Sequence, residues 1–187
     1  MELREYIRIF HKSWILIVAA TLLGLGLGAV ASLAATPQYE ARTQLYVSVQ
    51  SDVGSTGDLV QGTNYARQIV GSYVDVVRTG IVLDPVAEQL QLDITGAELA
   101  SYVTASSPTN TVLINITASS PDPEQAALIS NAVGESFKDV VRNDLEPERA
   151  SGQSPVSLTT TQVALTPTAA VSPNTPVNLA LGLLLGL

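Results

Sequence analysis

The chain has 187 residues and a formal net charge of −8, with 17 acidic and nine basic residues. It contains no cysteine, which excludes a disulfide framework and thiolate metal sites. Between residues 36 and 177, six basic residues stand against fifteen acidic ones and form no cluster, so this part lacks the electrostatic signature of nucleic-acid binding. The apolar fraction of 46% is ordinary for a globular protein, but much of it lies in two blocks at the ends.

The first apolar block is residues 15–35, a run of 21 residues without a charge. A helix of this length reaches across the hydrocarbon core of a bilayer, which is about 30 Å thick. Three basic residues precede the run, and none follows it before Arg42. We therefore predict a cytoplasmic amphipathic segment at 1–14, a transmembrane helix at 15–35 and an extracytoplasmic domain beyond. A cleaved signal peptide is the alternative, although its apolar core usually has only about 7–15 residues.

The middle of the chain, residues 36–166, is predicted to be an extracytoplasmic α/β domain of order β-α-α-α-β-α-β. Alternating apolar residues predict strands at 40–50, 110–119 and 157–165, and helical periodicity predicts helices at 58–79, from 84, from 95 and at 122–145. We expect an α+β fold: a small mixed sheet of about three strands with packed helices, one of them long, flanked by two transmembrane helices.

Several local signals predict where these helices begin and end. Gly80 is expected to close the first of them in a left-handed conformation. Asp84 is expected to cap the next helix, with Pro85 at its first position. Thr95 and Glu98 have the spacing of a capping box.

The second apolar block begins at Asn178 and reaches Leu187, which is too short to cross a bilayer. We expect residues 178–187 to be the start of a second transmembrane helix, with a short hydrophobic tail as the alternative. The preceding residues 167–177 hold prolines that favour extended backbone. A membrane-approach motif is predicted there, formed by Pro173, Asn174 and Pro176.

Both apolar blocks carry a GxxxG pair. These glycines are Gly24 and Gly28 in the first block and Gly182 and Gly186 in the second. Such spacing lets two helices approach closely, although glycine is common in transmembrane helices for other reasons as well. The four glycines are the predicted helix-packing residues.

We predict no catalytic residues, no cofactor and no metal site, and therefore no enzyme within these residues. The single histidine, His11, precedes the first apolar block, so no Ser/His/Asp arrangement can form in the outer domain. The sequence has no GxxxxGK[ST] phosphate loop, so a kinase would have to lie beyond Leu187 or on another chain. The abundant carboxylates are interpreted as a solvated surface.

Four stretches together resemble the polysaccharide chain-length-determinant (Wzz-type) co-polymerases, more narrowly the actinobacterial and Gram-positive members associated with a tyrosine kinase. The stretches are LREYIRIFHKSWILI, YEARTQLYVSVQ, DLVQGTNYARQIVGSYVDVVRTGIVLDPVAEQLQL and SPNTPVNLALGLLLGL. Their order and spacing carry the resemblance. Enterobacterial members have a long helical extension, whereas Glu146-Pro147 ends the main predicted helix here.

The resemblance implies a homo-oligomer in the bacterial plasma membrane that acts beside a polysaccharide polymerase and its glycan chain. It implies regulation of the length of an exported capsule, exopolysaccharide or lipopolysaccharide, and activation of a cytoplasmic tyrosine kinase domain or partner. Two alternatives stay open from the sequence. One is the extracytoplasmic sensor domain of a two-helix signalling protein, and the other is a secreted carbohydrate-binding module that would require signal cleavage.

Overall fold

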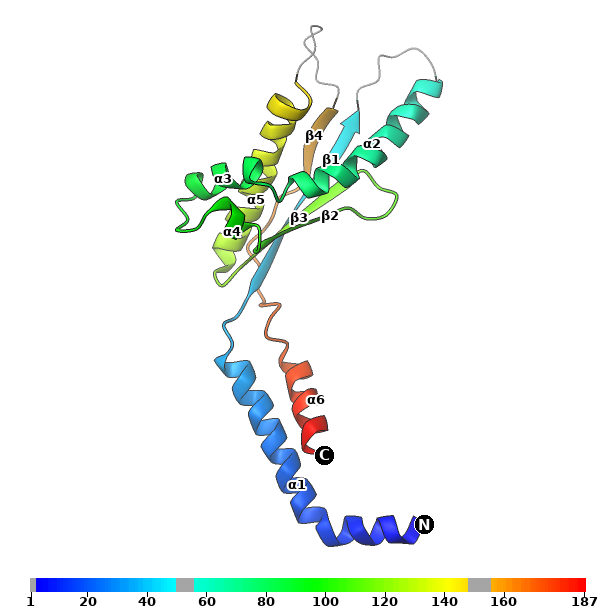
Figure 1. Cartoon of the computed structure of the whole chain (residues 1–187), viewed down its shortest axis with the longest axis vertical. Helices are drawn as coiled ribbons and strands as arrows, with labels where there is room; N and C mark the ends of the chain where they lie inside the picture. Colours follow the sequence, from blue (N-terminus) through cyan, green and yellow to red (C-terminus); the bar gives the residue numbers. More distant parts are fainter. Residues whose placement is uncertain (1–2, 50–55, 148–155) are drawn as a thin grey trace. The chain divides into compact units, whose positions relative to one another are not determined.

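The computed structural model describes the backbone of residues 3–49, 56–147 and 156–187, and the side chains of 14–49, 66–147 and 156–187. The chain divides into two compact units. One unit comprises Met1–Gln38 and Ala170–Leu187 and holds the two apolar helices. The other comprises Tyr39–Ala169 and holds a sheet with its covering helices (Figure 1).

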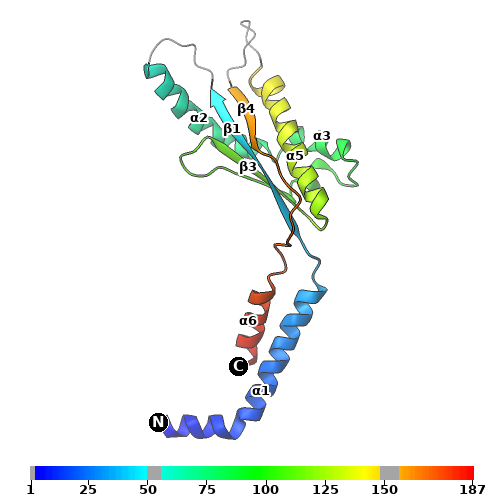
Figure 2. The same ribbon diagram turned by 180° about the vertical axis from the view of Figure 1, so that it is seen from behind.

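The first unit is a pair of helices, α1 (Leu3–Ala34) and α6 (Thr175–Gly186), which lie side by side in Figures 1 and 2. Within α1, Trp14–Ala34 is 21 residues long and apolar enough to cross a membrane. This confirms the predicted membrane-capable helix near the amino terminus. The second apolar helix is shorter, at 12 residues, and begins three residues before the predicted start at Asn178.

The second unit is built on a four-stranded sheet of order β2-β3-β1-β4. Its strands are β1 (Tyr39–Val49), β2 (Val103–Ser106), β3 (Leu113–Ser120) and β4 (Val156–Gln162). Every neighbouring pair is antiparallel, so the α+β class is confirmed while the expected mixed sheet of three strands is wrong. The missed strand, β2, has four residues, which is too short for an alternating pattern to be recognised.

The core lies between the sheet and the long helix α5 (Pro123–Val140). Along β1 the side chains of Ala41, Thr43, Leu45 and Val47 are buried, as the period-2 pattern predicts. A Cβ added at Gly134 of α5 would lie only 3.2 Å from the Cγ2 atom of Thr43, so this glycine lets the helix approach β1 closely. Helix α2 (Thr56–Val76) joins the same core through Tyr73, whose ring meets that of Phe137 edge-on at 5.8 Å.

Two predicted helix boundaries are wrong at α3 (Gly80–Gln89). Gly80 begins this helix instead of closing the previous one, and Pro85 lies inside it. The buried stripe of α3 spans the proline on both sides; its members are Val82, Leu83, Val86 and Ala87. Burial of this stripe therefore outweighs the helix-start signal that Asp84-Pro85 carries in the sequence. The Asp84 carboxylate instead accepts a hydrogen bond from the Gly96 N–H at 3.1 Å.

Other predicted boundaries are confirmed. Short helix α4 (Gly96–Leu99) begins with a complete Thr95–Glu98 capping box. The Glu98 carboxylate accepts hydrogen bonds from the Thr95 N–H at 2.9 Å and from its hydroxyl at 3.0 Å. These bonds stabilise the charged form and lower the pKa of Glu98. Helix α5 continues into a π-helical turn, η1 (Val141–Leu145), and the helical run ends before Pro147, as expected.

Candidate helix-packing site

The predicted glycines lie where α1 and α6 come closest within the first unit. A Cβ added at Gly24 would collide with the Gly182 carbonyl oxygen, and one added at Gly182 would collide with that of Gly24. A Cβ at Gly28 would lie 2.6 Å from the carbonyl oxygen of Asn178. A Cβ at Gly186 would lie 2.5 Å from that of Ala20. Any side chain at these four positions would force the two backbones apart, since such contacts are shorter than real Cβ atoms tolerate.

Gly26 lies in the same helix between Gly24 and Gly28 but does not face α6. A Cβ added there would meet nothing within 4 Å. The sequence shows three glycines at alternate positions, and the structure separates the two that pack from the one that does not. Helical geometry explains the difference, because residues four apart share a face and residues two apart do not.

Polar side chains join the two helices beside the glycines. The Asn178 Nδ2 atom donates a hydrogen bond to the Ser32 hydroxyl at 2.9 Å. Ser32 is 8% exposed although it belongs to an otherwise apolar segment. The Thr21 hydroxyl donates to the Ile17 carbonyl at 2.8 Å and lies 3.4 Å from the Gly186 carbonyl oxygen. Sequence analysis did not assign these residues to the contact; the signal available was a polar residue on the same helix face as the glycines.

The residues of the predicted membrane-approach motif surround the start of α6. Asn174 is the N-cap, and its side-chain oxygen accepts the Val177 N–H at 3.4 Å. Pro176 lies in the first helical turn, where its missing N–H is not needed. Pro173 precedes the cap and follows a cis peptide bond. Just upstream, Ser172 forms an antiparallel bridge with Gln38, whose N–H donates to the Ser172 carbonyl at 2.9 Å.

In the second unit, Asn131 of α5 holds the extended chain that follows β4. Its Nδ2 atom donates to the Ala164 carbonyl at 3.0 Å, and its Oδ1 atom accepts the Ala164 N–H at 2.8 Å. The Thr43 hydroxyl of β1 donates to the same Oδ1 atom at 2.7 Å and lies 3.0 Å from the Ser130 hydroxyl. Ala164 is buried against the alanines Ala41, Ala126 and Ala127. One amide therefore secures the chain segment between β4 and the approach to α6.

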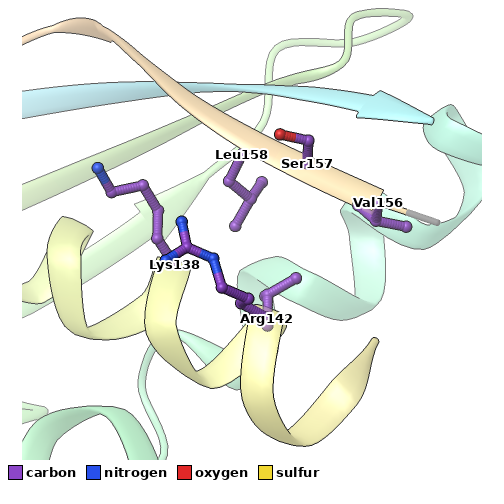
Figure 3. Close-up of a pocket in the computed structure, with 6 residues that line it drawn as sticks. Lys138, Arg142, Val156, Ser157 and Leu158 are labelled. Carbon is purple, nitrogen blue, oxygen red and sulfur yellow. The ribbon is translucent and has the colours of Figure 1, made fainter. Parts of the chain in front are cut away.

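A small pocket lies between the end of α5, η1 and β4 (Figure 3). It has a volume of about 60 Å³, far below the several hundred Å³ of typical ligand pockets. Its two cations already have acidic neighbours: Lys138 Nζ lies 2.7 Å from Glu135, and Arg142 lies 3.9 Å from Asp139. The Lys138 ammonium also donates to the Thr160 hydroxyl of β4 at 3.2 Å. The pocket is thus a packing detail, and no ligand is assigned to it.

Among residues 14–49, 66–147 and 156–187, no three His, Cys, Asp or Glu side chains gather closely enough to hold a metal ion. His11 lies outside the residues whose side chains are described. The features that stand out in the described chain are therefore structural: a close helix pair and a sheet domain.

Comparison with known proteins supplies the family. Residues 1–90 match the Wzz family, described as chain length determinant protein. The chain is 27% identical over 187 residues to the probable capsular polysaccharide biosynthesis protein YwqC of Bacillus subtilis, covering all of this chain and 73% of the relative. It is 27% identical over 168 residues to the capsular polysaccharide biosynthesis protein CapA of Staphylococcus aureus, covering 89% of this chain and 75% of CapA.

A further relative is the capsular polysaccharide biosynthesis protein CpsC of Streptococcus pneumoniae, which is 24% identical over 136 residues. That match covers 70% of this chain and 59% of CpsC. The resemblance that the sequence motifs suggested is thereby confirmed. Residues 1–90 of this membrane protein, which include its membrane-capable helix, belong to the Wzz chain length determinant family.

Proposed function

We propose that this chain is a membrane-anchored co-polymerase that regulates the chain length and export of a cell-surface polysaccharide. The observation that carries the proposal is the match to the Bacillus subtilis capsular protein along the whole chain, both apolar helices included. Three relatives from different Gram-positive genera bear names that place them in capsule biosynthesis. A capsular or related extracellular polysaccharide is therefore the proposed product.

The proposed topology places residues 1–14 in the cytoplasm and 36–166 outside, with 15–35 and the helix from 178 in the bilayer. Three basic residues before α1 support this orientation, since cytoplasmic ends of membrane helices are enriched in Lys and Arg. Residues 167–177 form the approach to the membrane. The acidic outer domain stays clear of anionic headgroups because like charges repel.

The proposed role of the glycine contact is to hold α1 and α6 as one rigid element. In lipid, helices associate through close backbone packing and interhelical hydrogen bonds, and both are present here. A rigid pair fixes the outer domain to whatever the helices touch on the cytoplasmic side. The proposed partner there is a bacterial tyrosine kinase, either on another chain or on a segment beyond Leu187, because residues 1–187 contain no phosphate-binding loop of the GxxxxGK[ST] kind.

The decisive experiment deletes the gene in the host bacterium and measures the length distribution of the surface polysaccharide. We expect a shifted or broadened distribution that wild-type protein restores. A Gly24→Leu variant should restore it poorly, whereas the matched Gly26→Leu variant should restore it fully. The reason is that Gly24 faces α6 and Gly26 does not. An unchanged length distribution after deletion would overturn the proposal and leave the sensor-domain alternative.

Topology can be tested separately because the chain has no cysteine. A cysteine at the exposed position Ser157 should react with a membrane-impermeant maleimide in intact cells. A cysteine at His11 should react only after permeabilisation. The reverse pattern would place the sheet domain in the cytoplasm and refute the proposed orientation.

A further inference from the structure

The two edges of the sheet are open in the described part of the chain. Strand order β2-β3-β1-β4 leaves β2 and β4 with one neighbour each, and no other described strand pairs with their outer sides. Exposed edges invite pairing with another chain, and proteins usually guard them with charges or prolines along the strand. Neither β2 nor β4 contains a charged residue or a proline.

Charge is absent well beyond the edge strands. No charged residue occurs between Glu98 and Asp122, the stretch that contains β2, and none follows Arg149, the stretch that contains β4. Yet residues 36–177 carry six basic and fifteen acidic residues. Two copies with this acidic excess repel each other over most of their surface. At the uncharged sheet edges, two copies can meet without bringing like charges close together.

The strand directions make the two edges complementary. All neighbours are antiparallel, so β2 runs parallel to β1, and β4 runs opposite to both. A second copy placed in the same orientation beside the first therefore brings its β2 edge to the first copy's β4 edge in an antiparallel arrangement. Antiparallel pairing of two β4 edges would instead turn one copy end for end.

The chain's connections exclude that inverted arrangement for copies anchored in one membrane. Strand β1 begins just after α1, and β4 is the last strand before α6. Because β1 and β4 are antiparallel, the start of β1 and the end of β4 point toward the same end of the sheet, and both connections leave from there. Copies turned end for end would send their connections in opposite directions. Among antiparallel pairings of the edges, only the β4-to-β2 arrangement keeps them all directed toward one bilayer.

The free peptide groups of the two edges also match. Val47 donates its N–H to the Val112 carbonyl on the β3 side, so its β4 partner Leu158 directs its own N–H and C=O outward, and so does Thr160. The Ser119 N–H donates to the Tyr102 carbonyl, so the peptide groups of Val103 and Ala105 are directed away from β3. Val103 is fully buried, whereas Ala105 is partly exposed, so Ala105 is the accessible outward residue of β2. It belongs to the same core face of the sheet as Leu158 and Thr160.

We propose that copies of this chain assemble by pairing the β4 edge of one sheet with the β2 edge of the next, forming one sheet that continues from copy to copy. The occupant of each open edge is a second copy of the same chain. This inference rests on the proposed function insofar as it places all copies in one membrane. In the central register, Leu158 pairs with Ala105 of the next copy, which brings Thr159 opposite the exposed Thr104.

Cysteine cross-linking of the full chain in membranes tests the pairing, because the protein has no native cysteine. Residues opposite each other in a non-hydrogen-bonded pair have Cα atoms about 4.5 Å apart, within the range that a disulfide spans. Thr104→Cys is combined in turn with Ser157→Cys, Thr159→Cys or Thr161→Cys, which covers three registers on the exposed face. Arg42→Cys with Thr117→Cys, opposite each other on β1 and β3, gives an intrachain control for a folded sheet.

We expect one double variant to give a ladder of dimers, trimers and larger species after mild oxidation, and every single variant to give none. A strong dimer from Thr159→Cys alone would overturn the proposal in favour of β4-to-β4 pairing. The absence of a ladder from all three double variants, while the control disulfide forms, would overturn it as well.

A charge test gives an independent readout. Like charges opposite each other across strands are destabilising and opposite charges are not. A Thr104→Lys/Thr159→Lys variant should therefore lose the large species seen for wild type by mass measurement in detergent, and Thr104→Lys/Thr159→Glu should regain them. Equal assembly of the two variants would contradict the edge pairing. Polysaccharide length after gene deletion is a separate measurement. It can therefore show whether the edge-pairing proposal or the proposed function is wrong.

Discussion

Substituting Gly24 by alanine should weaken the contact between α1 and α6 by about 1 kcal/mol. The new Cβ would overlap the Gly182 carbonyl oxygen, whereas carbon and oxygen atoms normally stay about 3.3–3.6 Å apart. The backbones must therefore separate by about 1 Å. A gap of roughly 0.5–1 Å forfeits a quarter to a half of each contact energy of about 0.1–0.2 kcal/mol. Over roughly twenty heavy-atom pairs this amounts to about 1 kcal/mol, or about five-fold in the pairing equilibrium.

The assay uses a disulfide as a measure of how often the helices meet. Ser32→Cys and Asn178→Cys replace side chains that are 2.9 Å apart in the helix contact. Their disulfide is equilibrated against glutathione in membranes, which yields the effective concentration of one thiol near the other. We expect Gly24→Ala to lower this value about five-fold and Gly26→Ala to leave it unchanged. Equal values for the two variants would refute the assignment of Gly24 to the contact.

Three further predictions concern the sheet domain, measured by denaturant unfolding of the full chain in detergent. Asn131→Ala should destabilise it by about 2–4 kcal/mol, because the buried N–H and carbonyl of Ala164 lose their partners; a loss below about 0.5 kcal/mol would show that water replaces the amide. Phe137→Ala should cost about 3–5 kcal/mol and Leu128→Ala almost nothing, since Phe137 is fully buried and Leu128 is 57% exposed. Glu98 has a lowered pKa in the fold, so its contribution is complete above its ordinary pKa of 4.5 and is lost as the pH falls through the lower value. Glu98→Gln should therefore flatten the decline in stability below pH 4.5, and an unchanged decline would contradict the capping role.

Those parts of the fold that depend on local chemistry were predictable from the sequence. The capping box at Thr95 depends only on residues three apart, and the charge-free run of α1 is long enough to identify a membrane helix by itself. The α+β class followed from the order of periodic segments. The strand β1 was predictable because Leu45 and Val47 repeat with the period of a half-buried strand.

Features that depend on distant residues were not predictable in the same way. Pro85 is tolerated inside α3 because the helix buries apolar residues on both sides of it, a tertiary effect that outweighs a strong local signal. Strand β2 exists because β3 offers it partners, and four residues carry too little pattern to reveal that. At the helix contact, the spacing of Gly24 and Gly28 suggested packing, but only the backbone geometry distinguishes them from Gly26.

The distribution of charge links the two proposals about assembly. Residues after Arg149 carry no charge, and they include both the open edge β4 and the helix α6. A charge-free segment suits lipid, where an unpaired charge is costly, and it equally suits a seam between acidic copies, meaning the proposed β4-to-β2 contact. The same segment can therefore supply a helix in the bilayer and a pairing edge in the sheet. A single charge introduced at Thr159 should disturb the seam without affecting membrane insertion, whereas a charge at Gly182 should disturb the helix contact first.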